Sequence, residues 1–82
     1  MSEIDQDELE NAFEQIVQKQ RIQKEDGYTE AGVLGCTSFI QRRLQIGYNH
    51  AARLLEEMER RFWITEPNSS GARQIIRQDM VG

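Results

Sequence analysis

The sequence predicts a mainly α-helical domain with a small β-hairpin, and three observations support this fold class. Two segments with apolar residues at helical spacing flank a glycine at position 47, and a third such segment lies near the N-terminus. Two short β-type runs follow, separated by a loop of Pro, Asn, Ser and Gly. At 82 residues the chain is predicted to form a single domain, too small for a roomy active-site cavity.

The first predicted helix covers residues 5–21. Leu9, Phe13 and Ile16 recur at helical spacing, and acidic residues occupy the first turn, where the helix dipole favours them. Residues 24–35 contain three glycines and no sustained periodicity. They predict a long loop, with a short strand near residues 31–34.

The second and third predicted helices are joined by a tight turn. The second begins at Thr37 or Ser38, either of which can cap the first turn, and ends before Gly47, whose tolerance of positive φ suits the turn. The third helix continues from there. Its predicted buried stripe consists of Tyr48, Ala51, Ala52, Leu55, Met58 and Phe62.

The β-type runs are residues 63–65 and 72–76, and the loop between them is residues 66–71. Three helices followed by such a hairpin form a winged helix-turn-helix, with the hairpin as the wing. The whole chain, residues 1–82, is therefore predicted to be one winged-helix domain. Residues 1–4 and 77–82 are expected to be flexible tails.

Cysteine and histidine usage argues against enzymatic and metal chemistry. The chain has one cysteine, Cys36, and one histidine, His50, too few for a zinc site. A nucleophilic Cys36–His50 pair is conceivable, but a small buried residue at a helix start is the favoured interpretation of Cys36. The sequence contains no glycine-rich phosphate loop. We therefore expect no enzymatic activity, no cofactor and no metal.

Charge is distributed unevenly along the chain. The net charge is −4, but acidic residues dominate the first 36 residues, whereas all seven cations after them are arginines. Arginine suits bidentate contacts with guanine and phosphate. The N-terminal residues lack the features of a signal peptide, and no apolar run could span a bilayer, so a cytoplasmic protein without membrane contact is expected.

Residues 38–76 carry a longer pattern. It consists of Ser38, Ile40, Gln41-Arg42, Leu44, the run IGYNHAAR at 46–53, Leu54-Leu55, Glu56 and Met58-Glu59, and it ends with Gly71, Arg73 and Ile75-Ile76. This pattern resembles the gamma domain at the C-terminus of the bacterial DNA translocases FtsK and SpoIIIE, a winged-helix module. The resemblance implies sequence-directed binding of double-stranded DNA, with a tyrosine recombinase as a further partner.

The resemblance also implies a set of DNA-contacting positions. Asn49, His50 and Arg53 would face the major groove, where Arg pairs with guanine and Asn with adenine. Gln41 and Arg42 would lie near the DNA backbone and Arg73 on the wing. The DNA-binding hypothesis adds Arg43 and Arg60, which would hold phosphates together with Arg42 and Arg73. The predicted DNA-binding residues are Gln41, Arg42, Arg43, Asn49, His50, Arg53, Arg60 and Arg73.

The chain departs from the family pattern in four respects. His50 stands where the family has arginine, Phe62 stands where it has a helix-ending glycine, and the 24–35 connection is longer. An 82-residue chain also cannot hold the ATPase motor, so a free-standing module or a piece of a larger protein is expected.

A second functional hypothesis is a protein-interaction winged helix of a phage or mobile element that binds a recombinase, polymerase or defence complex. The acidic first helix motivates it, since that helix could act as a DNA mimic. A homodimer on two half-sites is compatible with either function. The sequence offers no direct evidence for dimerisation.

Overall fold

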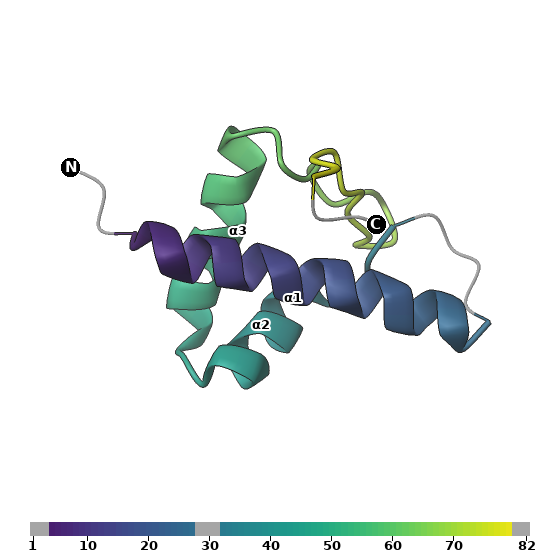
Figure 1. Ribbon diagram of the computed structural model, residues 1–82, viewed down its shortest axis with the longest axis horizontal. Coiled ribbons are helices and arrows are strands. Elements are labelled where there is room, and N and C mark those ends of the chain that lie inside the picture. Colours follow the sequence, from purple (N-terminus) through teal and green to yellow (C-terminus); the bar gives the residue numbers. More distant parts are fainter. Residues whose placement is uncertain (1–3, 28–31, 80–82) are drawn as a thin grey trace.

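The computed structural model describes residues 4–27 and 32–79. In these ranges the chain forms three helices: α1 (Gln6–Glu25), α2 (Cys36–Leu44) and α3 (Tyr48–Arg60). The long helix α1 crosses both shorter helices (Figure 1). The predicted three-helix arrangement is confirmed, with changes at its helix ends and in its wing.

Helix α1 begins where the sequence predicts and ends one turn later. Asp5 caps it by accepting a hydrogen bond from the Asp7 amide at 3.0 Å. The extra turn is held by Gln23, whose side-chain amide donates to the Gly32 carbonyl and accepts from the Leu34 amide, both at 3.2 Å. The predicted end at residue 21 is therefore wrong, because a contact with a distant segment stabilises the last turn.

Helix α2 differs from the prediction at both ends. It begins at Cys36, one residue before Thr37, and is preceded by Gly35 in the left-handed region at φ 61°. At its C-terminus Gln45, not Gly47, adopts positive φ, at 55°. Gly47 has a φ of −72° and caps α3 in an extended conformation. Ile46 packs against the core while its amide bonds the Gln41 carbonyl, and this docking makes the chain turn at Gln45.

The buried stripe of α3 is narrower than predicted and shifted. Ala51, Leu55 and Met58 are buried as expected, but Leu54 is also fully buried, which the prediction missed. The predicted burial of Tyr48 and Phe62 is wrong: they are 58% and 75% exposed. Tyr48 is the first residue of α3, and Phe62 lies beyond the end of the helix at Arg60, so neither belongs to the covered stripe. Ala52 is half-buried.

The core is formed by the stripes of the three helices and by two residues from the connecting segments. Leu9, Phe13 and Ile16 of α1 are fully buried against Ile40 of α2 and the α3 stripe. Val33 and Ile64, which form backbone bridges with Arg73 and Ile75, complete the core. Burial of each such side chain contributes about 1.5 to 3 kcal/mol.

The predicted β-hairpin is wrong as a pair of strands. Among the described residues there are only two isolated antiparallel bridges, Ile64 with Ile75 and Val33 with Arg73. The Thr65 amide bonds the Gln74 carbonyl, but the Gln74 amide bonds the Thr65 hydroxyl instead of its carbonyl, at 2.9 Å. The Thr65 carbonyl accepts from the Arg73 guanidinium at 3.1 Å. Side chains thus take the bonds that would extend a strand ladder.

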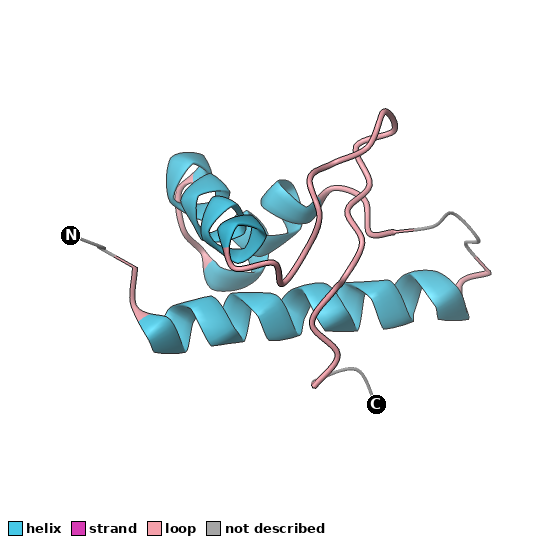
Figure 2. Cartoon of the chain, turned by 90° about the horizontal axis from the view of Figure 1, so that it is seen from above, coloured by secondary structure: helices cyan, strands magenta, loops and turns pink. Residues whose placement is uncertain are grey.

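The loop of the wing is nevertheless well defined. The Asn68 side-chain oxygen accepts from the amides of Ser70 and Ala72, and the Asn68 amide bonds the Ala72 carbonyl. Residues 66–71 therefore form the expected turn between two extended segments. Its tip lies on the same side of α1 as α3 does (Figure 2).

Arg77 fixes the C-terminal segment to α1. Its guanidinium makes two hydrogen bonds with Glu10, at 3.0 and 3.2 Å, and lies over the rings of Phe13 and Trp63 at 5.0 and 4.2 Å from their centroids. Hydrogen bonds from Arg77 also hold the pKa of Asp79 below its ordinary value. The sequence predicts a flexible tail from residue 77 onward, but Arg77 is held against α1 by these contacts. Residues 1–3, 28–31 and 80–82 lie outside the described ranges.

A carboxylate near the end of α3 ties this helix together. Glu57 is buried and accepts hydrogen bonds from Arg60 and from Arg61, the latter at 2.7 Å. These bonds lower the pKa of Glu57, the one from Arg60 having the larger effect. Arg61 also donates to the Gln6 side chain at 2.7 Å. The network therefore connects the C-terminus of α3 with the first turn of α1.

Substituting the turn residue that bears the positive φ should stabilise the domain. We expect Gln45→Gly to raise the free energy of unfolding by about 1 kcal/mol, because a non-glycine residue in the left-handed region costs about 1 to 2 kcal/mol. Gly47→Ala should change it by less than about 0.5 kcal/mol. Alanine reduces the conformational entropy of the unfolded chain, and this stabilising effect offsets its weaker preference for the N-cap position. Urea unfolding of both variants measures this. A large loss in Gly47→Ala with no gain in Gln45→Gly would contradict the observed turn.

Acid should destabilise the domain partly through Glu57. Its lowered folded-state pKa contributes stability that is present above its ordinary value of 4.5 and is lost as the pH falls through the lowered value. We expect the melting temperature to fall between about pH 5 and pH 3, and to fall less steeply in Glu57→Gln. Glu14→Gln, at an exposed carboxylate of α1, is the control and should keep the wild-type slope. Equal slopes in wild type and Glu57→Gln would refute this role of Glu57.

Candidate nucleic-acid interface

The outer face of α3 presents two of the predicted base-contacting side chains together. Asn49 and Arg53 are four residues apart, so they lie on one face of the helix, and both are exposed. Neither side chain makes a hydrogen bond or ion pair with another described residue. Both are therefore available to an external ligand at the N-terminal half of α3.

His50 points elsewhere. Its Nε2 atom lies 2.8 Å from Oε1 of Glu8 on α1, and both side chains are about one-third exposed, at 34% and 27%. A residue adjacent to Asn49 is rotated by about 100° around the helix, which turns His50 toward α1. The structure therefore places His50 between two helices and apart from the Asn49–Arg53 face.

Helix α2 contributes Gln41, Arg42 and Arg43, which differ in their availability. Arg42 is exposed and makes no ion pair with any residue in ranges 4–27 and 32–79, whereas Gln41 is half-buried. Arg43 donates to the Gln15 side chain at 3.0 Å and lies over the Phe39 ring, 5.4 Å from its centroid. Arg42 is therefore the arginine of α2 whose charge has no partner among the described residues. Helix α2 packs directly against α3.

The two remaining predicted arginines are occupied by carboxylates. Arg60 is paired with Glu57 on its own helix. Arg73 donates to Glu59 at 2.7 Å and to the Thr65 carbonyl, and its side chain is only 14% exposed. Arg73 thus fastens the wing to the C-terminal turn of α3. The sequence could have suggested the Glu57 pairs, because charges at i, i+3 and i, i+4 face each other on a helix.

The acidic first helix is partly used internally. Glu8 contacts His50, and Glu10 contacts Arg77. Helix α1 lies on one side of the molecule, while α3 and the tip of the wing lie on the other (Figure 2). These pairs leave the net charge of −4 unchanged, because the Glu10 pair uses one side chain of each sign and the Glu8 partner is a histidine. The Asn49–Arg53 face is formed by α3 and not by the acidic helix.

Cys36 does not form the nucleophilic pair that its sequence allowed. It is buried, its thiol lies 3.5 Å from the Val33 carbonyl, and burial raises its pKa. His50 is engaged with Glu8 instead. The interpretation of Cys36 as a small buried residue at a helix start is confirmed.

The described residues contain neither a metal-binding cluster nor a helix that could span a membrane. In ranges 4–27 and 32–79, no group of three or more His, Cys, Asp or Glu residues could hold a metal ion. Within the same ranges, every helix is too short or too polar to cross a bilayer.

Comparison with known proteins shows that the chain is similar to short parts of several bacterial DNA translocases. It is similar to the DNA translocases FtsK of Treponema pallidum, with 56% identity over 41 residues, and of Rickettsia typhi, with 34% over 74 residues. These matches cover 50% and 90% of this chain but only 5% and 10% of the translocases. The match to the FtsK of Rhizobium meliloti, at 43% identity over 58 residues, covers 63% of this chain and 7% of that protein. No solved structure matches the chain.

A family model agrees with these relatives. The model described as the Ftsk gamma domain matches residues 28–78, which include α2, α3, the wing and every predicted DNA-binding residue. The match covers more than half of the chain and confirms the resemblance read from residues 38–76. The chain therefore belongs to the FtsK gamma domain family.

Proposed function

We propose that this chain is a double-stranded DNA-binding module whose α3 enters the major groove. The observation that carries the proposal is the exposed pair Asn49 and Arg53, which share one face of α3 and have no partner among the described residues. Arginine can bond guanine O6 and N7 together, and asparagine can bond adenine N6 and N7. Membership in the gamma family and the DNA translocase relatives support the same function. Such a module would act in the cytoplasm.

The proposed phosphate contacts depend on which cations have no partner within the described residues. Arg42 of α2 is the proposed main backbone contact, because it is exposed and unpaired within the described residues, with Gln41 beside it. Arg43, Arg60 and Arg73 already have partners in the chain, so each would have to exchange or share them to hold a phosphate. We therefore propose a secondary role for these three, including Arg73 on the wing.

The relatives are far longer than this chain, so their remaining properties are proposals here. A protein partner such as a tyrosine recombinase is implied by the family resemblance, and a homodimer stays a prediction. The DNA-mimic hypothesis receives less support, because Glu8 and Glu10 of the acidic helix serve internal contacts. Failure of the DNA experiments below would favour a protein-interaction function.

Removing Arg53 should reduce sequence discrimination. After selection of bound duplexes from a random pool, we expect Arg53→Ala to lose about 1 to 3 kcal/mol of preference for the selected sequence. Arg42→Ala should instead weaken all duplexes alike and reduce the salt slope by about one unit. Arg21→Ala, at an exposed cation of α1, is the matched control. Fluorescence anisotropy at two salt concentrations measures these effects, and an Arg53→Ala variant that behaves like Arg21→Ala would exclude base reading by Arg53.

Removing His50 should affect stability more than DNA binding. Because its imidazole contacts Glu8, we expect His50→Ala to lower the free energy of unfolding by up to about 1 kcal/mol. Affinity for the selected duplex should change by less than about threefold, below the effect of losing a good base contact. Thermal unfolding and anisotropy on one preparation separate the two effects. A large loss of base preference at unchanged stability would instead place His50 in the groove.

A further inference from the structure

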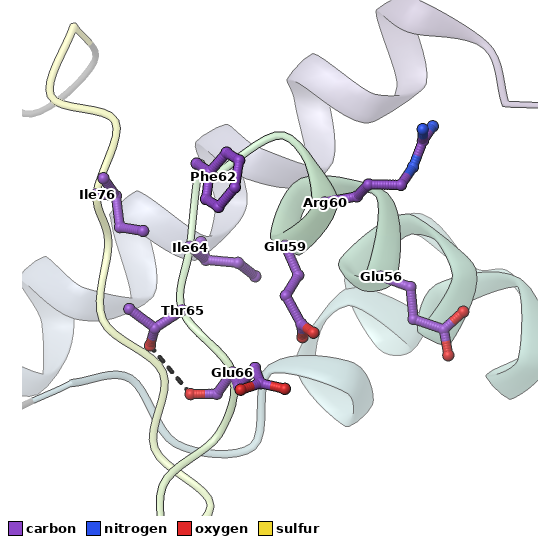
Figure 3. A pocket seen from close by; sticks show the side chains of 8 residues that line it. All are labelled: Glu56, Glu59, Arg60, Phe62, Ile64, Thr65, Glu66 and Ile76. Atoms are coloured by element: carbon purple, nitrogen blue, oxygen red, sulfur yellow. Dashed lines mark hydrogen bonds between the residues drawn. The ribbon is translucent and has the colours of Figure 1, made fainter.

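A groove lies beside the end of α3, outside the proposed DNA-reading residues. Its volume is about 590 Å³, and it is bounded by the last turn of α3, by residues 62–66 and by Ile76 (Figure 3). The wing segments and α3 thus form its two walls. None of the Asn49, Arg53 and Arg42 side chains lines it.

The floor of the groove is apolar and partly open to solvent. Phe62 is 75% exposed and Ile76 is 46% exposed, while Ile64 beneath them is buried. Phe62 also has a φ of 63°, a conformation that costs a bulky L-residue about 1 to 2 kcal/mol. The positive φ ends α3, as the Phe62 and Trp63 amides bond the Glu59 and Met58 carbonyls, and a glycine could adopt it without strain. Phenylalanine at this position places an exposed aromatic ring beside the exposed Ile76, which together form an apolar surface in the groove.

Carboxylates dominate the rim. Glu56 and Glu66 are exposed, and their carboxylates make no ion pair with a described residue. Glu59 is paired with Arg73 but remains 32% exposed. The one cation of the lining, Arg60, shares the carboxylate of Glu57 with Arg61. The rim therefore presents two unpaired carboxylates, Glu56 and Glu66, beside an apolar floor.

The apolar floor and the carboxylates of the rim determine which kind of ligand the groove can bind. The unpaired carboxylates of Glu56 and Glu66 would repel phosphates, so we place the groove outside the main DNA contacts at Asn49, Arg53 and Arg42. A bulky apolar side chain would cover Phe62 and Ile76, and neighbouring cations would pair with Glu56 and Glu66. We propose that the groove docks a segment of a partner protein in which a bulky apolar residue is flanked by lysine or arginine.

The proposal is tested by selecting peptides without assuming a sequence. A random peptide library is displayed against the intact wild-type chain and, in parallel, against Ile76→Lys. We expect the wild type alone to enrich peptides that place Leu, Ile, Phe or Trp next to Lys or Arg. A synthetic peptide from this set should bind Ile76→Lys at least about tenfold more weakly, as expected for loss of a central apolar contact.

Matched variants separate the groove from general charge attraction. Ile22→Lys changes an isoleucine of nearly equal exposure, 47%, on α1 and should bind the peptide as the wild type does. Glu66→Lys should weaken binding, whereas Glu14→Lys, at an exposed carboxylate of α1, should not. Phe62→Gly removes the ring while relieving the positive φ, so it should fold and still lose affinity.

Several results would overturn the proposal. They are the absence of enriched peptides, enrichment of acidic peptides, and equal binding by wild type, Ile76→Lys and Phe62→Gly. Sedimentation provides a further check, because self-association lost in Ile76→Lys would make a second copy of this chain the occupant. Duplex DNA that displaces the peptide from the wild type would assign the groove to the DNA interface. None of these results depends on whether Arg53 reads bases, so the two functions are tested separately.

Discussion

The structure depends on the burial of the apolar stripe of α1 against the two shorter helices. Phe13, Leu9 and Ile16 are fully buried there, and since the described part of the chain forms isolated bridges in place of a strand ladder, helix packing provides most of the core. This packing determines which face of α3 is covered. Leu54 and Leu55 point toward the core, so Asn49 and Arg53 are left on the solvent side.

Internal ion pairs determine which charges remain available to a ligand. Several carboxylates are paired with arginines or with the histidine within the fold, which leaves the net charge of −4 unchanged but removes both partners of each pair from the groups that a ligand could contact. The same pairs occupy Arg60 and Arg73. On α2 and α3, Arg42, Asn49 and Arg53 remain without a partner among the described residues, and a carboxylate-rimmed groove lies at the other end of α3.

The wing shows how a side-chain network can replace a sheet. Arg73 bonds both Glu59 and the Thr65 carbonyl, and the Thr65 hydroxyl accepts from the Gln74 amide. The two segments are therefore aligned and fastened to α3, although between residues 63–65 and 72–76 the structure shows an isolated bridge and no strand ladder. Arg77, stacked on Phe13 and Trp63, holds the following residues against α1. The position of the wing relative to α3 thus depends on arginines that sequence patterns associate with phosphate binding.

The sequence by itself determined the helices, the family and the candidate residues. Helical periodicity and the pattern of residues 38–76 were enough, because both are local and specific. The tertiary structure decided where the chain turns, which helix residues are exposed and which side chains pair. Ile46 packs against the core, and the positive φ occurs at Gln45 instead of Gly47. Tyr48 at the start of α3 and Phe62 beyond its end are exposed. Above all, contacts between distant residues turned His50 toward Glu8 and Arg73 toward Glu59. A single sequence records no such pairings, because the partners lie far apart along the chain and meet only when the helices pack.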